Sequence, residues 1–252
     1  MSFYTSNLSD SQWQYISNFL DTKRNRKYQL REVFNGILYL VKTGCQWRLL
    51  PGDFPNWRIV YYYFSVWKKA GIIAALQEAL VEKTRLKSGR KAWPTAGIID
   101  AQSVKSTLVS SESRGFDAGK KVKGIKRHII TDTLGLVLAV VIQSASVQDR
   151  DGAQEVIKMM CESWKNIIKL FADGGYRGKL IELIKTTFKI EMEIIKRNEL
   201  HTFKILPKRW IVERTFSWID TNRRNSKNYE RLNNTGVAMV HLASIRIMLK
   251  RF

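Results

Sequence analysis

Apolar residues recur at helical spacing through the first third of the chain. The apolar positions lie three or four residues apart, which is the spacing of one helix face. Ser9 is suited to begin the first of these helices, and Gly44 and Gly71 to end the next two. Helices joined by short, basic turns are typical of a helix-turn-helix type domain. We predict helices over three ranges: 12–20, 30–43 and 57–69.

The pattern changes after Pro94. Residues 83–91 are basic and contain a Ser-Gly pair, which predicts a linker. Short β-rich runs follow, and then strand and helix alternate, which favours an α/β layer domain. We therefore predict a small all-α domain with its linker over 1–93 and an α/β domain over 94–252. The predicted strands are 96–99, 128–131, 136–142, 167–172 and 190–195, and the predicted helices are 152–164, 180–188, 206–220 and 237–249.

The net charge narrows the choice of partner. Lys and Arg number 43 and Asp and Glu 22, which leaves a formal charge of +21. Such an excess favours a polyanionic partner, most often nucleic acid, although membrane-surface binders and ribosomal-type proteins share it. A hydrophobic fraction of 44% excludes a disordered basic tail. Both predicted domains are basic, so we expect both to contact the nucleic acid.

Composition also bears on compartment and metal chemistry. The longest apolar run, 134–142, is shorter than the roughly 20 residues that span a bilayer, and no signal peptide is visible. Cys45 and Cys161 lack metal-ligand spacing, and the three histidines are scattered. We expect a cytoplasmic protein without membrane attachment. Any metal would be held by carboxylates, which favours Mg²⁺ or Mn²⁺.

Three acidic residues are placed as metal-dependent phosphodiester chemistry requires. Asp100 and Asp173 each follow an apolar strand, and Glu213 lies within a predicted helix. Two-metal catalysis needs carboxylates that converge on ions roughly 3.5–4 Å apart. Each acid also has a simpler interpretation. Asp100 could cap a turn, Asp173 could begin the Gly174-Gly175 turn, and Glu213 could pair with Arg209 on the helix surface.

Other polar residues are explained without chemistry. His128 precedes a strand and is interpreted as structural. Three further acids lie in a hairpin turn or at a helix start, where capping accounts for them: Asp132, Asp149 and Asp151.

Basic side chains gather near the candidate acids. Residues 114–127 predict a mobile basic loop that grips phosphates, the alternative being a solvated charged hairpin. A second group surrounds Glu213 in sequence, and Arg177 follows Asp173. The predicted DNA contacts are Lys120, Lys121, Lys123, Lys126, Arg127, Arg177, Arg209, Arg214, Arg223 and Arg224.

An aromatic group marks the third predicted helix. Its members at helical spacing are expected in the core: Trp57, Tyr61, Phe64 and Trp67. The side chains of this helix that could face DNA are Arg58, Tyr62 and Lys69.

Several motifs carry a family resemblance over nearly the whole chain. They are TGCQWRLLP (43–51), IDAQSVK (99–105), GKKVKGIKRH (119–128), ADGGYRG (172–178) and WIVERTFSW (210–218). With these motifs the chain resembles bacterial insertion-sequence transposases of the DDE type, in particular the IS5 group of the IS4-like superfamily.

The resemblance implies a fold and an activity. The fold would be a ribonuclease H-like catalytic domain, a mixed sheet flanked by helices, preceded by the small helical domain. Asp100, Asp173 and Glu213 would be the metal-binding triad, with two Mg²⁺ (or Mn²⁺) ions in each active site. The enzyme would bind the terminal inverted repeats of double-stranded element DNA, cut there, and join the 3′-hydroxyl ends to target DNA. It would act as a homodimer on DNA in the bacterial cytoplasm, associated with the nucleoid, without a small-molecule substrate.

The chain departs from the superfamily pattern at two places. Asp220 stands where a basic residue often follows the glutamate by seven positions, and Arg223 or Arg224 would serve instead. Arg209 matches the upstream arginine, but Leu206 stands where a tyrosine is usual. Two alternatives remain open: a ribonuclease H-like nuclease or resolvase without strand transfer, and a non-catalytic, repressor-like DNA-binding protein.

Overall fold

The structure, a computed structural model, describes residues 4–107, 112–195 and 209–251. The chain divides into two compact units, which we describe separately. The helical unit comprises Met1–Leu80, Ile219–Ser226 and Ala238–Phe252, and the sheet unit comprises Val81–Trp218 and Lys227–Val237. The predicted domain boundary at 93/94 concerns function and stays a prediction. The two compact units of the structure are divided at other positions.

Local sequence signals set the ends of the first helices. The Ser9 hydroxyl accepts a bond from the Gln12 amide (3.3 Å), and the Gln12 side chain accepts one from the Ser9 amide (2.9 Å). This capping box satisfies two donors that a helix start would otherwise leave unpaired. Gly44 ends the second helix at a φ of 71°, as predicted. The helices of this part are α1 (Asp10–Ser17), α2 (Leu30–Thr43), α3 (Trp57–Lys69) and α4 (Ile72–Lys87).

The linker predicted over 83–91 is wrong as far as Lys87, because α4 continues to that residue. Ile73, Leu76 and Leu80 recur at helical spacing and are buried. Lys83, Arg85 and Lys87 belong to the C-terminal turns of this amphipathic helix, and Arg90 and Lys91 follow it.

The core prediction for α3 holds only in part. Phe64 and Trp67 are buried, but Tyr61 is 45% exposed and Trp57 is half-buried. Because an α-helix has 3.6 residues per turn, residues spaced three or four apart drift around its axis. Trp57 and Tyr61 therefore lie nearer the surface than Phe64 and Trp67.

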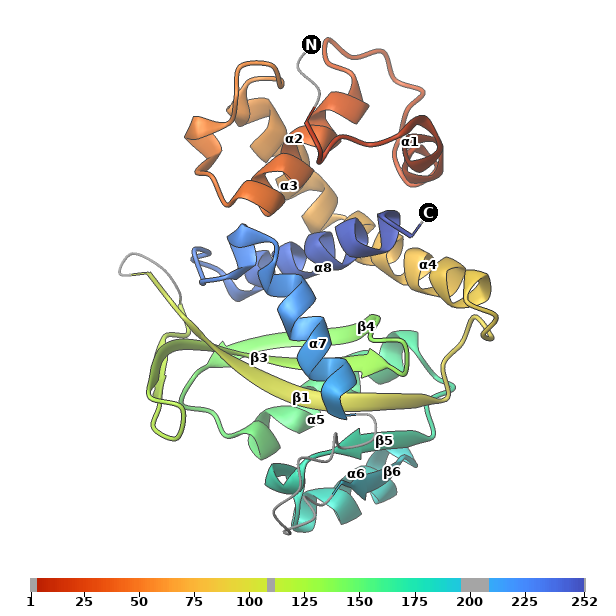
Figure 1. The fold of residues 1–252 in the computed structure, drawn as a ribbon, viewed down its shortest axis with the longest axis vertical. Coiled ribbons are helices and arrows are strands. Elements are labelled where there is room, and N and C mark those ends of the chain that lie inside the picture. The colour runs from red at the N-terminus through yellow and green to blue at the C-terminus, as the bar shows by residue number, and fades with distance from the viewer. Residues whose placement is uncertain (1–3, 108–111, 196–208, 252) are drawn as a thin grey trace. The chain divides into compact units, whose positions relative to one another are not determined.

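The sheet unit is built on a mixed β-sheet (Figure 1). Within the described residues the strand order is β2-β3-β1-β5-β6, and β4 also pairs with β3. β1 pairs antiparallel with β3 and parallel with β5. The strands are β1 (Ala96–Lys105), β2 (Gly115–Asp117), β3 (Val122–Asp132), β4 (Val137–Ser144), β5 (Lys169–Ala172) and β6 (Glu191–Ile194).

Helices cover both faces of this sheet. β4 is buried continuously from Val137 to Ile142, as expected for a strand covered on two sides. α5 and α7 lie on opposite sides of the sheet in Figure 1. The predicted α/β class, with a ribonuclease H-like sheet domain after a helical region, is confirmed. The helices after the first strand are α5 (Asp149–Ser163), α6 (Lys179–Phe188), α7 (Arg209–Asp220) and α8 (Asn233–Leu249), and α8 belongs to the helical unit from Ala238 onward.

Two strands are longer than predicted. β1 does not end at Asp100 but continues to Lys105, because its pairing with β3 extends to Gly124. β3 begins at Val122, so the basic loop predicted over 114–127 is wrong. That segment is the β2–β3 hairpin, the alternative that the charge pattern had left open.

Two observations complete the fold. The helix predicted over 206–220 begins at Arg209, and residues 206–208 lie outside the described residues. In the described part of the chain, no helix combines the length and apolarity that crossing a membrane requires.

Candidate active site

Asp100 lies in the middle of β1. Because Asp100 is inside the strand, it does not cap a turn. Side chains alternate between the two faces of a strand, so Asp100 faces away from Ala101 and from its partner His128. His128 packs directly against Gly152 of α5. Asp100 therefore points to the opposite face, on the side where α7 lies.

Asp173 follows β5 directly, and its position relative to Asp100 comes from the strand register. Ile98 of β1 stands opposite Phe171 of β5 in the parallel pair. Asp100 and Asp173 each follow this pair by two residues, Asp173 directly after the end of β5, so a continued register would bring both to the same face of the sheet. The Asp173 carboxylate also accepts a bond from the Gly175 amide (2.8 Å), so the turn interpretation holds as well.

Glu213 is exposed on α7, while Val212 and Phe216 turn inward. α7 is fixed to the β3–β4 turn by two bonds: Arg214 Nη2 donates to the Leu134 carbonyl (3.1 Å), and Thr215 Oγ1 to the Gly135 carbonyl (2.8 Å). The helix therefore holds Glu213 in the layer that Asp100 faces.

The donor set fits a hard divalent cation in its chemistry, since all three candidates supply carboxylate oxygens. Among the described residues, however, no three Asp, Glu, His or Cys side chains are gathered closely enough to hold a metal ion. Continuing the register of β1 with β5 brings Asp100 and Asp173 to the same face of the sheet. That all three acids bind one metal site together stays a prediction.

The predicted DNA contacts divide by exposure. Lys126 and Arg127 lie inside β3 with only 5% and 3% of their surface exposed, so their prediction as DNA contacts is wrong because both side chains are buried. Arg224 is buried too, and its Nη1 donates to the Cys45 carbonyl (3.2 Å). The side chain of Arg209 lies outside the described residues. The exposed members are Lys120, Lys121, Lys123, Arg177 and Arg223.

Arg214 also has a structural task. Its guanidinium carbon lies 4.4 Å from the ring centroids of both Trp210 and Trp218. Stacking between two indoles, together with the bond to Leu134, engages this side chain within the sheet unit.

Two of the acids explained by capping have further roles. Asp132 accepts from the amides of Leu134 and Leu136 and pairs with the buried Arg85 of α4. Burial raises the pKa of Asp132, although these partners oppose the shift. Asp149 does not cap α5: it is the first residue of the helix, and the N-cap residue is Gln148. Instead, Asp149 pairs with Lys126.

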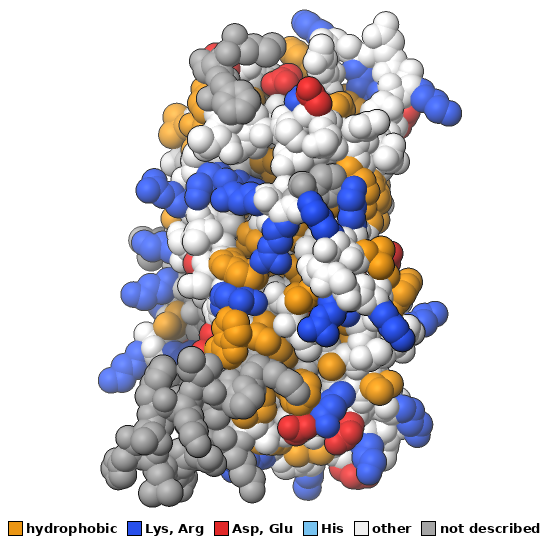
Figure 2. Space-filling view, turned by 45° about the vertical axis from the view of Figure 1, so that its right-hand side comes forward, with side chains coloured by type: hydrophobic (Ala, Val, Ile, Leu, Met, Phe, Trp, Pro, Cys, Tyr) orange, Lys and Arg blue, Asp and Glu red, His pale blue; other side chains and the backbone are white. Residues whose placement is uncertain are grey.

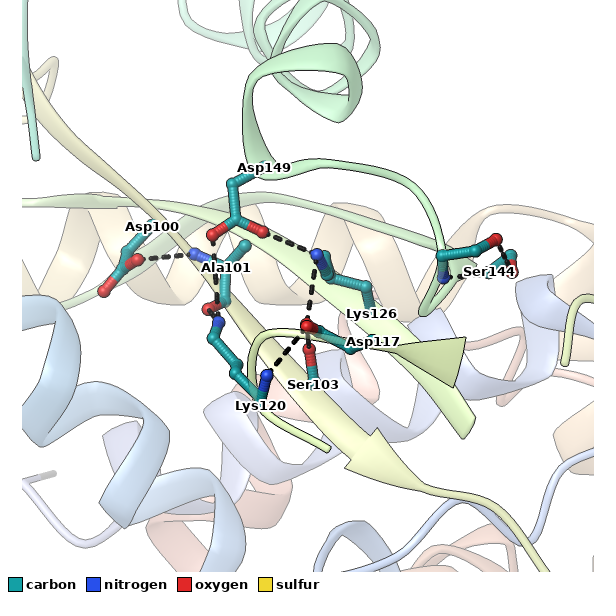
Figure 3. A network of polar contacts seen from close by, with 9 residues as sticks. Asp100, Ala101, Ser103, Asp117, Lys120, Lys126, Ser144 and Asp149 are labelled. Carbon is teal, nitrogen blue, oxygen red and sulfur yellow. Dashed lines mark hydrogen bonds and ion pairs between the residues drawn. The ribbon is translucent and has the colours of Figure 1, made fainter. Parts of the chain in front are cut away.

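Sequence reasoning missed a polar network beside Asp100 (Figure 3). Asp117 and Ser103 belong to it, yet neither is marked by spacing or by a motif of its own. They are brought to Lys126 only by the pairing of β1, β2 and β3.

On the face shown in Figure 2, Lys and Arg side chains are scattered widely and acidic side chains are few. This distribution agrees with the net charge of +21. A surface of this kind attracts polyanions over distances of about a Debye length.

The chain is similar to known proteins over most of its length. Residues 93–248 match the family model described as "Transposase DDE domain", and residues 8–77 match the one described as "Putative transposase of IS4/5 family". The chain is also 30% identical over 115 residues to the "Putative transposase for insertion sequence element IS402" of Burkholderia cepacia, an alignment that covers 43% of this chain and 54% of that protein. The chain thus spans about half the length of this curated relative.

Proposed function

Because the chain belongs to the transposase DDE domain family, we propose that it is the transposase of a bacterial insertion sequence. It binds the inverted repeats at the ends of the element, cuts there, and joins the freed 3′-hydroxyl ends to target DNA. The observation that carries this proposal is the register of β1 with the parallel strand β5, which runs up to Ile98 and Phe171, two residues before Asp100 and Asp173. Asp173 follows the carboxyl end of β5, and such strand ends are where α/β domains build their sites.

In the proposed mechanism Asp100, Asp173 and Glu213 would hold two Mg²⁺ or Mn²⁺ ions. Bound there, the ions would activate the attacking oxygen and stabilise the leaving one. The protein's part is orientation. The Gly175 amide holds the Asp173 carboxylate, and the bonds of Arg214 and Thr215 hold the helix that carries Glu213.

Phosphate binding falls to the exposed cations of the sheet unit. Lys121 and Lys123 lie on the β2–β3 hairpin, and Arg177 follows Asp173 after the short turn. Contacts of this kind position the DNA strand and are independent of its sequence.

We assign recognition of the element ends to α3 in the helical unit. Arg48 and Arg58 both stack on Trp57, with guanidinium carbons 5.6 Å from the ring centroid. Tyr62 is 57% exposed one turn further on. α3, which the structure describes in full, carries no acidic side chain. A basic, aromatic helix face without acids is suited to DNA and would repel a second copy of this basic chain.

Joining two element ends requires two active sites. We therefore propose that the protein acts as a homodimer assembled on DNA. Its place of action would be the bacterial cytoplasm, where chromosomal DNA is the target.

The test is cleavage of a plasmid that carries the gene with its flanking genomic DNA, in the presence of Mg²⁺. Asp173→Asn is the sharpest variant, because its amide oxygen can still accept from the Gly175 amide while the negative charge is lost. We expect wild-type cuts at inverted repeats that border the gene, and a loss of about 100-fold or more in the variant with unchanged DNA binding. Asp151→Asn, at an exposed acid on α5, is the matched control and should cut normally.

Each other outcome selects a different function. Tight binding without cleavage by the wild type would favour a repressor-like protein. Cleavage without joined products would favour a nuclease or resolvase. Normal cleavage by Asp173→Asn would refute the triad.

A further inference from the structure

Lys126 carries a buried charge that its environment neutralises. Its side chain on β3 has 6% of its surface exposed. The ammonium lies 2.8 Å from Asp149 Oδ1 and 3.3 Å from Asp117 Oδ2. Figure 3 shows Lys126 between these two carboxylates. An unpaired buried ammonium costs several kcal/mol, so the two acids are what make this position tolerable.

The two carboxylates tie separate elements together. Asp117, on β2, accepts from the Ser103 hydroxyl of β1 (2.5 Å) and from the Lys120 amide (3.0 Å). Burial alone would raise the pKa of Asp117, but these bonds and Lys126 lower it to about 2, so the carboxylate is charged at neutral pH. Asp149 belongs to the first turn of α5.

A second lysine connects this network to the residue after Asp100. The ammonium of Lys120 donates to the Ala101 carbonyl (3.0 Å) and lies 3.8 Å from Asp149 Oδ2. Ala101 in turn donates its amide to Asp100 Oδ1 (2.7 Å). β5 pairs with β1 only as far as Ile98, so this part of β1 receives no support from that strand.

The network grips β1 from the face opposite to Asp100. Ser103 and Lys126 are register partners and lie on the α5 side, together with Ala101 and His128. The Asp100 side chain projects to the other face. The network therefore constrains the backbone that carries Asp100 without occupying the space in which DNA would bind.

We propose that Lys126, acting through Asp117 and Asp149, is a positioning residue for Asp100 and makes no contact with DNA. The inference rests on the proposed function of Asp100. A carboxylate that holds a metal ion must be fixed to within about 0.5 Å. Among the described strands, β3 is the one that pairs with β1 at Asp100, and the network adds a second set of contacts to this part of β1.

The test replaces Lys126 by Met, which keeps most of the aliphatic stem and removes the charge. At saturating DNA we expect cleavage to fall at least about tenfold, because misplacement of a reacting group by ~1 Å costs up to about 100-fold. The dissociation constant for DNA and its salt dependence should equal those of the wild type. If binding weakens and the slope of log K against log salt drops by about 0.9, Lys126 contacts phosphate and the inference is wrong.

Three further variants serve as controls for Lys126→Met. Lys123→Met removes an exposed cation of the same strand and should weaken binding with the smaller salt slope. Lys158→Met, on the exposed side of α5, is the neutral control. If Lys126→Met fails to fold, Lys126→Met with Asp117→Asn and Asp149→Asn replaces it, since that triple variant removes the buried ammonium together with both of its carboxylates and leaves only the exposed charge of Lys120. Wild-type cleavage by a folded variant overturns the inference.

Amide hydrogen exchange separates this inference from the proposed function. We expect faster exchange at residues 100–103 in Lys126→Met than in Lys158→Met, whether or not DNA is cut. If the wild type cuts no DNA, the proposed function fails, and exchange still decides whether the network holds β1. Equal exchange in the two variants would show that it does not.

Discussion

At the scale of single residues, the sheet unit contains several buried polar side chains. Some of them have polar partners among the described residues and others do not. Lys126 and Asp132 are buried and paired, whereas His128 is fully buried with both ring nitrogens unpaired in the described structure. Buried polar groups cost stability when they lack a partner. These positions are therefore where pH and substitution act most strongly.

His128 predicts an acid-dependent loss of stability. Burial lowers its pKa to about 4; nearby Asp149 opposes this shift, and Lys126 and Lys120 add to it. The unfolded chain binds a proton near pH 6.5 and the folded one only near pH 4, so stability present above pH 6.5 is lost as pH falls toward 4. From these values we expect a loss of about 2 kcal/mol between about pH 7 and pH 5.

Urea unfolding of wild type and His128→Phe at the two pH values measures the share of His128, because His241, whose pKa burial also lowers to about 4, titrates in both. His128→Phe keeps a ring against Gly152 and removes the titration, so its stability should change less between the two pH values. An equal pH dependence in variant and wild type would contradict the assignment.

At the scale of elements, β1 and the β2–β3 hairpin decide the geometry of the site. The hairpin folds so closely onto β1 that Gly124 has no room for a side chain. A Cβ there would lie 1.9 Å from the Val104 carbonyl oxygen. A backbone atom cannot move aside as a flexible side chain can, so this glycine is required by the close approach of two strands.

Gly124→Ala should destabilise the protein by about 2 kcal/mol or more, because overpacking forces the strands apart. Gly119→Ala, in the same hairpin, is the matched control, since the nearest atom to its Cβ is 3.5 Å away. We expect this control to change stability by less than about 0.5 kcal/mol. Thermal unfolding compares the two, and similar melting temperatures would refute the close approach.

At the scale of the whole molecule, the charge of +21 governs association. Both compact units contain exposed cations, Arg58 in the helical unit and Arg177 in the sheet unit among them. Binding that neutralises phosphates releases counterions and weakens as salt rises.

We expect DNA affinity to fall by about 10³ or more between about 50 and 200 mM salt if six or more phosphates are neutralised. Arg58→Ala should weaken binding to element ends more than binding to unrelated DNA if it reads bases, and equally if it touches only phosphate. Fluorescence anisotropy with both duplexes distinguishes the two. An Arg58→Ala variant with wild-type affinity for both would remove α3 from the interface.

Local sequence patterns determine several helix ends and helix faces of this protein, and its family. Ser9 as an N-cap, Gly44 as a helix end and the apolar face of α2 depend on contacts a few residues apart, so the sequence alone predicted them. The motifs around Asp100, Asp173 and Glu213 identified the family in the same way.

What only the tertiary structure decided depends on partners distant in sequence. The register of β1 with β5 places Asp100 beside Asp173, and the pairing of β1 with β3 carries β1 past Asp100 and buries Lys126 and Arg127. A lysine in a basic stretch looks the same in sequence whether it meets DNA or a carboxylate from another strand. The difference lies in burial and in distance between elements, which residue order does not specify.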